Sequence, residues 1–283
     1  MSAAALLAGA GTAQATPYPG PNGTKDVRGA IEQEWLRLQA GTGFKPGAPL
    51  SDEAPTAGAV GAFNTFQNGV IYWSPGTGAH EVHGAFYGYW AGQGFERGPL
   101  GYPLTNEQPA AAGGVFQVFQ GGTLYWSPAT GAHKVSGSFY QLWASLGWER
   151  SFLGFPISEE LPAAGGVFQR FQGGTLYWSP ATGAHSVSGA FYSYWAARGW
   201  ERGTLGYPTS QELVSANGVY QNFQGGTLTW TRAQGVVRQS KAFYANCTDV
   251  WNTIGSPLYA GQQGYSRDLD RDGDGVACEV DPR

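Results

Sequence analysis

Apolar side chains recur with a helical period at similar places along the chain. In the segment GSFYQLWASLG the positions i, i+3, i+4 and i+7 are Phe139, Leu142, Trp143 and Leu146. This spacing predicts a short amphipathic helix that buries one stripe. Gly147 suits the left-handed residue that ends a helix. Nearer the N-terminus, Ile31, Trp35 and Leu38 keep the same stripe and predict an equivalent helix.

A strand pattern follows each helical one. The segment VFQVFQGGTLYWSP alternates with period two, and Gly121-Gly122 suits a two-residue hairpin turn. Alternation then places on one face Gln117, Phe119, Leu124 and Trp126. The opposite face varies between copies, with Thr65, Val118, Arg170 and Asn222 at one position. We therefore expect Trp126 and its copies, Trp73, Trp178 and Trp230, to lie in the core. The alternative is a platform on which a ligand stacks.

The two patterns repeat together. The stretch FQGGTLYWSPATGAH occurs twice without change, and the strand tryptophans are separated by 53, 52 and 52 residues. A fixed period near 50 predicts a tandem array in which each unit covers its neighbour. We delimit four helix–loop–hairpin units at 27–82, 83–135, 136–187 and 188–238. The predicted fold class is α+β, a tandem repeat array that is either open or closed into a ring.

Several repeated side chains are candidates for ligand binding. Tyr72, Tyr125 and Tyr177 fall on the variable face, where an exposed tyrosine would stack on a sugar ring. The alternative is a cross-strand aromatic pair that supports the hairpin. Glu-Arg pairs also recur, with their arginines at Arg97, Arg150 and Arg202. We expect structural ion pairs there, or else a polar rim that grips ligand hydroxyls.

His80, His133 and His185 also follow the repeat, each at the end of a GAH turn. The simplest interpretation is a turn-packing histidine with a satisfied hydrogen bond. The three could meet only at the axis of a closed ring. No catalytic motif is visible in the repeats, neither a nucleophile elbow nor a metalloprotease helix.

Composition narrows the class of protein. Only 13% of the 283 residues are charged, the net charge is −4 and no Lys/Arg run occurs, so we expect no nucleic-acid partner. Residues 1–15 resemble a signal peptide without its usual basic start, the alternative being a disordered tail. Residues 16–26 are interpreted as a linker. We expect no transmembrane span and a monomer. In an exported chain the isolated pair Cys247 and Cys278 predicts a disulfide rather than two free thiols.

Three tetrapeptides give the repeats a family resemblance: Leu100-Gly101-Tyr102-Pro103, Leu153-Gly154-Phe155-Pro156 and Leu205-Gly206-Tyr207-Pro208. Each lies between a [WF]ER stretch and a hairpin, and residues 27–238 resemble the LGFP-repeat family. The first unit departs from the pattern, with Gly47-Ala48-Pro49 in place of the tetrapeptide. The resemblance implies an exported protein held on a cell-wall polysaccharide of the arabinogalactan type.

The C-terminal sequence SRDLDRDGDGVACEVDPR alternates Asp270, Asp272 and Asp274 before Gly275. Oxygen ligands at positions 1, 3 and 5 with glycine at 6 are typical of an EF-hand-type loop, and Val276 would offer its carbonyl at position 7. The alternative is a solvated acidic turn. With FYANC upstream, the C-terminal module at 240–283 resembles the Excalibur calcium-binding module over about residues 242–280. That resemblance adds Glu279 to the ligands and implies a Cys247–Cys278 disulfide.

Together these patterns predict a secreted, non-catalytic protein of the cell envelope. Its repeats would bind wall polymer weakly and multivalently, and its C-terminal module would bind calcium. Two alternatives remain: an envelope enzyme, such as a hydrolase or acyltransferase, with an unrecognised site, and a spacer for a partner protein.

Overall fold

The computed structural model describes residues 16–58, 60–215, 218–240, 244, 246–260, 262 and 264–283. The predicted signal peptide, residues 1–15, lies outside them. The chain forms two compact units, one of residues 1–137 with 155–157 and the other of residues 138–154 with 158–283. No described helix is long and apolar enough to cross a membrane.

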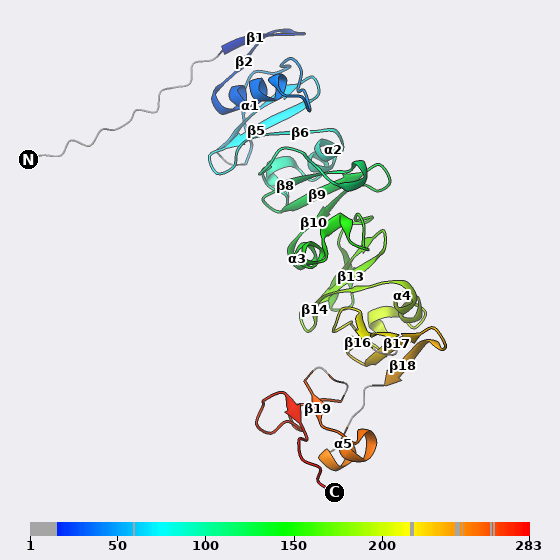
Figure 1. Ribbon diagram of the computed structural model, residues 1–283. Coiled ribbons are helices and arrows are strands. Elements are labelled where there is room, and N and C mark those ends of the chain that lie inside the picture. Colours follow the sequence, from blue (N-terminus) through cyan, green and yellow to red (C-terminus); the bar gives the residue numbers. More distant parts are fainter. Residues whose placement is uncertain are drawn as a thin grey trace, which may run out of the picture. The chain divides into compact units, whose positions relative to one another are not determined.

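The described residues of the first unit form two α-helices and three small antiparallel sheets, most of which are labelled in Figure 1. Its elements in chain order are β1 (Thr16–Gly20), β2 (Gly23–Val27), α1 (Gly29–Ala40), β3 (Ala54–Pro55), β4 (Ala62–Phe66), β5 (Gly69–Ser74), β6 (Gly78–His83), α2 (Gly84–Gly92), β7 (Gln108–Pro109), β8 (Val115–Phe119), β9 (Gly122–Ser127) and β10 (Gly131–Val135). The strands of each sheet are neighbours in sequence order. The helix–hairpin units that we predicted are therefore helices followed by four-stranded meanders.

The second unit repeats this arrangement and adds the C-terminal module. Its elements are α3 (Gly137–Leu146), β11 (Leu161–Ala163), β12 (Gly166–Phe171), β13 (Gly174–Ser179), β14 (Gly183–Val187), α4 (Gly189–Ala196), β15 (Leu213–Ser215), β16 (Gly218–Phe223), β17 (Gly226–Thr231), β18 (Gly235–Ser240), α5 (Cys247–Ile254), β19 (Leu258–Tyr259) and β20 (Val276–Ala277). Short 3₁₀ helices follow α2, α3 and α4 at Phe95–Arg97, Trp148–Arg150 and Trp200–Arg202.

The segment interpreted as a linker, residues 16–26, lies almost wholly within a hairpin. β1 and β2 pair antiparallel, from Thr16 with Val27 to Gly20 with Gly23. The Tyr18 ring packs edge-on against Trp35 of α1 at 4.6 Å between centroids. The Tyr18 hydroxyl also donates a 2.6 Å hydrogen bond to Glu32. This tyrosine, within a Pro- and Gly-rich stretch, gives the hairpin its contact with α1.

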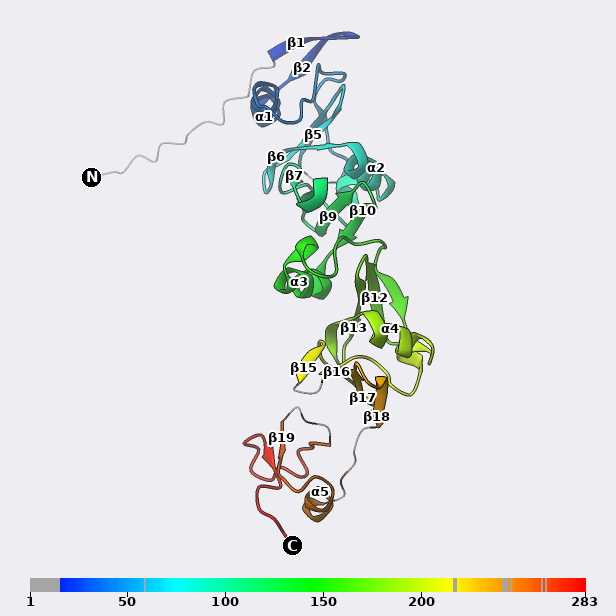
Figure 2. The same ribbon diagram turned by 45° about the vertical axis from the view of Figure 1, so that its right-hand side comes forward.

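Each central helix is covered on two sides by sheets. In the first unit, α2 contacts β5 and β6 on one side and β9 and β10 on the other (Figures 1 and 2). Trp90 of α2 is fully buried. Its ring lies 4.6 Å from Tyr72 and 5.7 Å from Phe119. In the second unit, α4 is arranged likewise, with Trp195 4.6 Å from Tyr177 and 5.4 Å from Phe223.

The predicted helix stripes are confirmed. Phe139 and Trp143 are buried in α3, Ile31 and Trp35 in α1. The hairpin register differs from our prediction. A turn at Gly121-Gly122 would pair Phe119 with Leu124, whereas Phe119 pairs with Gly122 and the turn residues are Gln120-Gly121. The partner of Phe119 shifts by an even number of residues, so every side chain keeps the face that alternation assigned to it.

The prediction that the strand tryptophans form the core is only partly right. Trp73, Trp126 and Trp178 are half-buried, and Trp230 is 38% exposed. The fully buried tryptophans are those of the helices, Trp90, Trp143 and Trp195. In the first unit the strand tryptophans lie at the margin of the aromatic clusters rather than at their centre.

The LG-Y/F-P loop that follows α2 connects this helix to the next hairpin. Gly101 has φ +65°, a left-handed conformation that favours glycine. The Trp90 indole donates to its carbonyl at 3.0 Å, and the Tyr102 amide donates to Gln120 Oε1 at 2.9 Å. In the first repeat, Gly47 has φ +81° and accepts from Trp35 at 2.8 Å. The degenerate tetrapeptide therefore keeps the geometry of the motif.

Candidate functional site

The acidic loop near the C-terminus brings three carboxylates together. One oxygen from each of Asp270, Asp272 and Asp274 lies within 4.8 Å of the other two. Asp270 is buried, whereas Asp272 and Asp274 are exposed. Gly273 and Gly275 have φ of +76° and +94°, so the sharp turn predicted at position 6 uses the freedom of glycine.

Asp270 is fixed as the inner member of this group. Its carboxylate accepts the Tyr265 hydroxyl and the amides of Gly273 at 2.9 Å and Gly275 at 3.0 Å. The hydrogen bond from Tyr265 is the first cause that lowers the pKa of Asp270, and the same bond raises the pKa of Tyr265. Asp270 therefore stays ionised and oriented.

Glu279 lies close enough to feel these charges. The negative charges of Asp274 and Asp272 raise the pKa of its carboxyl, as expected for like charges that share a site. Asp281, at the position of the usual bidentate glutamate, is instead engaged by Arg283 at 2.7 Å, which lowers its pKa to about 2. Glu279 is thus near the aspartates but is not among the three residues whose oxygens lie within 4.8 Å of one another, and its role as a ligand stays a prediction.

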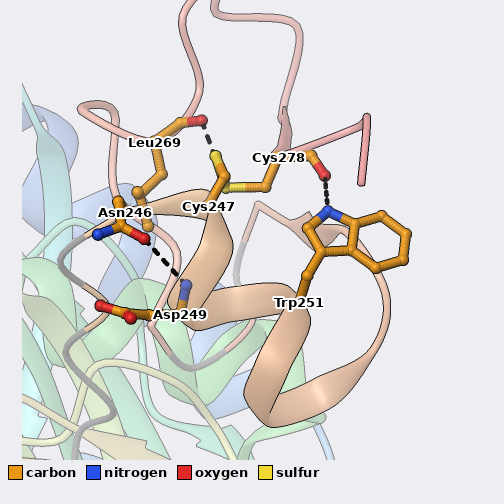
Figure 3. The surroundings of a disulfide bond; sticks show 6 residues. All are labelled: Asn246, Cys247, Asp249, Trp251, Leu269 and Cys278. Atoms are coloured by element: carbon orange, nitrogen blue, oxygen red, sulfur yellow. Dashed lines mark hydrogen bonds between the residues drawn. A yellow bond between two sulfur atoms is a disulfide. The ribbon is translucent and has the colours of Figure 1, made fainter. Parts of the chain in front are cut away.

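The predicted disulfide between Cys247 and Cys278 is confirmed (Figure 3), and Cys278 directly precedes Glu279 in the chain. Cys247 is the first residue of α5, whose N-terminus is capped by Asn246 accepting from the Asp249 amide at 3.0 Å. The Trp251 indole of the same helix donates to the Cys278 carbonyl at 2.9 Å. Two attachments to α5 thus fix the residue that precedes Glu279.

The residues fit a calcium ion. Calcium takes oxygen ligands at about 2.3–2.6 Å, so two ligands of one ion lie at most about 5 Å apart. The three aspartates meet this limit with their oxygens within 4.8 Å. Without a cation, adjacent carboxylates repel, and a central ion makes the interaction attractive. The amide of Val276 donates to Asp274 at 2.8 Å, while the use of its carbonyl as a ligand stays a prediction.

The tyrosines proposed as ligand contacts are not exposed. Tyr72, Tyr125 and Tyr177 are only 5%, 3% and 3% exposed. Our expectation of exposure was wrong because their face of the sheet is also covered: Tyr72 packs on α2 and Tyr177 on α4. Burial raises the pKa of both hydroxyls. They offer no surface to a sugar.

Each Glu-Arg pair lies in a 3₁₀ segment that follows a helix, and we call these segments the corners. In each corner the glutamate is directed inward and the arginine outward. Glu96 accepts the Ala57 amide at 3.0 Å and Glu201 accepts the Ala164 amide at 3.0 Å. The ion pairs that we predicted are long, 3.9 Å from Arg150 to Glu149 and 3.8 Å from Arg202 to Glu201. These two arginine side chains are 76% exposed, so each pair contributes little to stability.

Arg97 is likewise exposed, with its aliphatic stem against Gly58. The arginines therefore point outward from the corner that the glutamates fix.

The repeated histidines bond within their own units. His80, His133 and His185 each place Nε2 about 3 Å from the carbonyl of a threonine three residues earlier, at 2.9, 3.1 and 2.9 Å. This agrees with the simplest interpretation of these residues. They lie on strands rather than at the end of a turn.

Two features escaped the sequence analysis. Tyr265 holds Asp270, and only its place five residues before the first aspartate could have indicated this. Trp148 and Trp200 begin the WER corners with φ of +53° and +52° and are 42% and 41% exposed. A bulky residue in the left-handed region is an outlier, and sequence alone gives no sign of it.

Comparisons with known proteins agree with both resemblances. The LGFP repeat matches residues 47–98, 100–151, 153–203 and 205–256. Each match begins near the tetrapeptide loop, whereas we began each unit at its helix. The Excalibur calcium-binding domain matches residues 244–279. These two domains indicate a calcium-binding protein associated with the cell envelope. No curated protein matches the chain.

Similar solved structures are distant. Virginiamycin B lyase from Staphylococcus aureus is 9% identical with a TM-score of 0.13, and the match covers 66% of this chain and 54% of that one. The extracellular domain of a one-component system from B. thetaiotaomicron is 12% identical with a TM-score of 0.16, covering 69% of this chain and 29% of that one. This chain thus spans about half or less of these proteins.

Proposed function

Because the chain belongs to the LGFP-repeat family, we propose that it is an exported, non-catalytic protein held on an arabinogalactan-type wall polysaccharide by its repeats. The observation that carries this proposal is the outward-facing corner that recurs after α2, α3 and α4. A polymer of repeating sugars can engage several equivalent corners at once. Weak contacts, about 4 kcal/mol each for a millimolar Kd, then combine through effective concentration.

The chemistry of the corner suits a sugar. Trp148 and Trp200 expose 42% and 41% of their surface two residues before Arg150 and Arg202. An indole packs on the apolar face of a sugar ring, and a guanidinium donates to its hydroxyls. The backbone strain of the tryptophans supports this role, because strained residues cluster at functional sites.

The calcium module would stabilise the C-terminal end of the protein. Asp270, Asp272, Asp274 and Glu279 would supply carboxylate oxygens and Val276 a carbonyl. Extracellular loops of this type bind at about 0.1–1 mM, so ambient calcium would fill the site after export. We propose that the ion orders residues 266–283 and does not contact the polymer.

Co-sedimentation with purified arabinogalactan–peptidoglycan tests the proposal. We expect the protein to pellet with the wall, to be released by soluble arabinogalactan, and to release no sugar fragments itself. Pelleting should persist with a calcium chelator. Failure to pellet would contradict the proposal, and released fragments would favour the enzyme alternative.

A pair of double variants locates the contact. Arg150→Ala with Arg202→Ala should lower the affinity at least tenfold, because two corners lose their hydrogen-bond donors. Arg170→Ala with Arg232→Ala removes the same charge from exposed positions elsewhere in the second unit and should leave binding unchanged. Equal losses in both variants would indicate nonspecific charge attraction.

A further inference from the structure

A pocket in the first unit is lined by charged and aromatic side chains. Its volume is about 340 Å³, and its lining includes Arg28, Glu53, Trp73 and the first turn of α1. Small-molecule sites start at about 300 Å³. We propose that this pocket binds one sugar ring of the wall polymer, with Trp73 as the stacking surface and Arg28 and Glu53 as the groups that bind its hydroxyls. This inference rests on the proposed function and adds a site outside the WER corners.

Glu53 contributes a carboxylate to the lining of the pocket. It is half-buried, and burial raises the pKa of its carboxyl, while the positive charge of Arg28 acts in the opposite direction. Within the described part of the chain this carboxylate makes no hydrogen bond or ion pair. A desolvated carboxylate without donors is costly, and a ligand hydroxyl would supply one.

The equivalent glutamate of the next repeat shows the contrast. Glu107 stands 54 positions after Glu53. It follows Pro103 at the same spacing at which Glu53 follows Pro49. Its carboxylate lies 3.7 Å from His83 Nε2. His83 directly precedes α2, and Arg28 holds the equivalent position before α1. Glu107 is therefore partly satisfied by the protein, whereas Glu53 faces the pocket.

Trp73 supplies the apolar wall. Part of its indole packs against the cluster that includes Ile31 and Phe66, and the rest lines the pocket. A half-buried ring is rigid, so a ligand that stacks on it loses little side-chain entropy. An indole ring packs against the C–H face of a sugar, and this contact requires no charged group.

The charges of the pocket select a neutral polyol. Arg28 is 44% exposed and bonds Asp26 at 3.2 Å, which leaves further guanidinium donors available. An anionic ligand would be repelled by Glu53 and a cationic one by Arg28. A sugar with adjacent hydroxyls both donates to the carboxylate and accepts from the guanidinium.

Titration with an arabinofuranose tetrasaccharide, followed by the indole N–H signals in a ¹⁵N NMR spectrum, tests the site. The variant Trp73→Phe assigns the Trp73 signal by its disappearance, and the other indole signals report whether that variant is folded. We expect the Trp73 signal to shift with the tetrasaccharide and not with cellotetraose at the same concentration. A Trp73 signal that does not move at 10 mM tetrasaccharide would overturn the proposal.

Matched variants sharpen the test. Glu53→Gln should weaken the tetrasaccharide affinity about tenfold, the effect of losing one charged hydrogen bond. Glu160→Gln changes the equivalent residue of the third repeat, which is exposed, and should leave the Trp73 titration unchanged. Equal affinities of Glu53→Gln and the wild type would exclude the pocket while leaving wall sedimentation, and the proposed function, intact. If the wild type neither sediments nor titrates, both proposals are wrong.

Discussion

The repeats and the C-terminal module achieve stability by different means. In residues 27–238 of the repeats a helix tryptophan such as Trp90 is fully buried between two sheets, and neither cysteine lies in that range. In the module the buried cluster is small, built on Val250, Leu258 and Ala277 beside the disulfide. A domain of about 40 residues buries too little apolar surface to fold alone. The comparison indicates that stacking of helices and sheets replaces cross-links in the repeats, whereas the module has a covalent cross-link, to which the proposed calcium ion would add.

The largest effect should come from the repeat core. Trp90→Ala removes a fully buried ring and the indole donor to Gly101, and should lower the free energy of unfolding by about 3–5 kcal/mol. Denaturant unfolding followed by circular dichroism measures it. Trp148→Ala, 42% exposed, is the control and should cost less than about 1 kcal/mol. Similar decreases in the free energy of unfolding for the two variants would mean that the buried helix tryptophan is not a main source of repeat stability.

The disulfide should matter almost as much, but only locally. Cys247→Ser with Cys278→Ser opens a loop with a sequence separation of 31 residues, which should cost the module about 3–4 kcal/mol. Limited proteolysis with mass spectrometry should then show rapid cleavage within residues 246–283 and an unchanged repeat fragment. Faster cleavage in the repeats as well would show that the two regions are not independent.

Calcium should have the next largest effect. At 100 times its Kd, calcium should stabilise the module by about 2.7 kcal/mol through mass action. Asp272→Asn should weaken this effect, because it removes one of three clustered carboxylates. Asp281→Asn is the control, since that carboxylate is engaged by Arg283. Calorimetry with and without a chelator measures the shift, and equal responses of the two variants would contradict the assigned ligand set.

What the sequence could predict depended on how locally each feature is determined. The stripe through Phe139 and Trp143 specified α3, and the spacing of Asp270, Asp272 and Asp274 specified the loop, because both lie within a few residues. The burial of Tyr125 could not be derived in this way. The variation between repeats at the position of Val118 shows only that this one position, near the hairpin turn, accepts different side chains. We wrongly inferred from it that the whole face of the hairpin is exposed. The second covering of that face depends on contacts between elements, which no single hairpin pattern contains.

Two glycine variants test the LG-Y/F-P loop of the repeats. Gly101→Ala places a Cβ 2.5 Å from Gln120 Oε1 at φ +65°, and should cost about 1–2 kcal/mol. Gly88→Ala lies in the exposed interior of α2 with nothing within 4 Å, and should stabilise the protein by about 0.5–1 kcal/mol. Opposite shifts in the denaturation midpoint are expected, and shifts of the same sign would refute the role of the left-handed glycine.

The smallest effect is a dependence of repeat stability on pH. His83 Nδ1 lies 2.6 Å from Glu81 and Nε2 lies 3.7 Å from Glu107, while its ring stacks on Phe44 at 3.7 Å between centroids. Burial opposes the charged form, but the hydrogen bond and the two carboxylates outweigh it and raise the pKa of His83. Its contribution to stability is therefore complete below the unfolded pKa of about 6.5 and is lost as the pH rises through the folded pKa.

His185 should respond in the opposite sense and serves as the comparison. Burial lowers the pKa of His185, so the folded state favours its neutral form and stability falls as the pH drops below about 6.5. We expect His83→Gln to lose more stability at pH 5 than at pH 8. For His185→Gln, the loss relative to the wild type should be smaller at pH 5 than at pH 8, because the variant lacks the acid-induced penalty. Unfolding free energies at the two pH values measure both differences, and equal pH profiles for the two variants would show that the carboxylates around His83 do not control its charge.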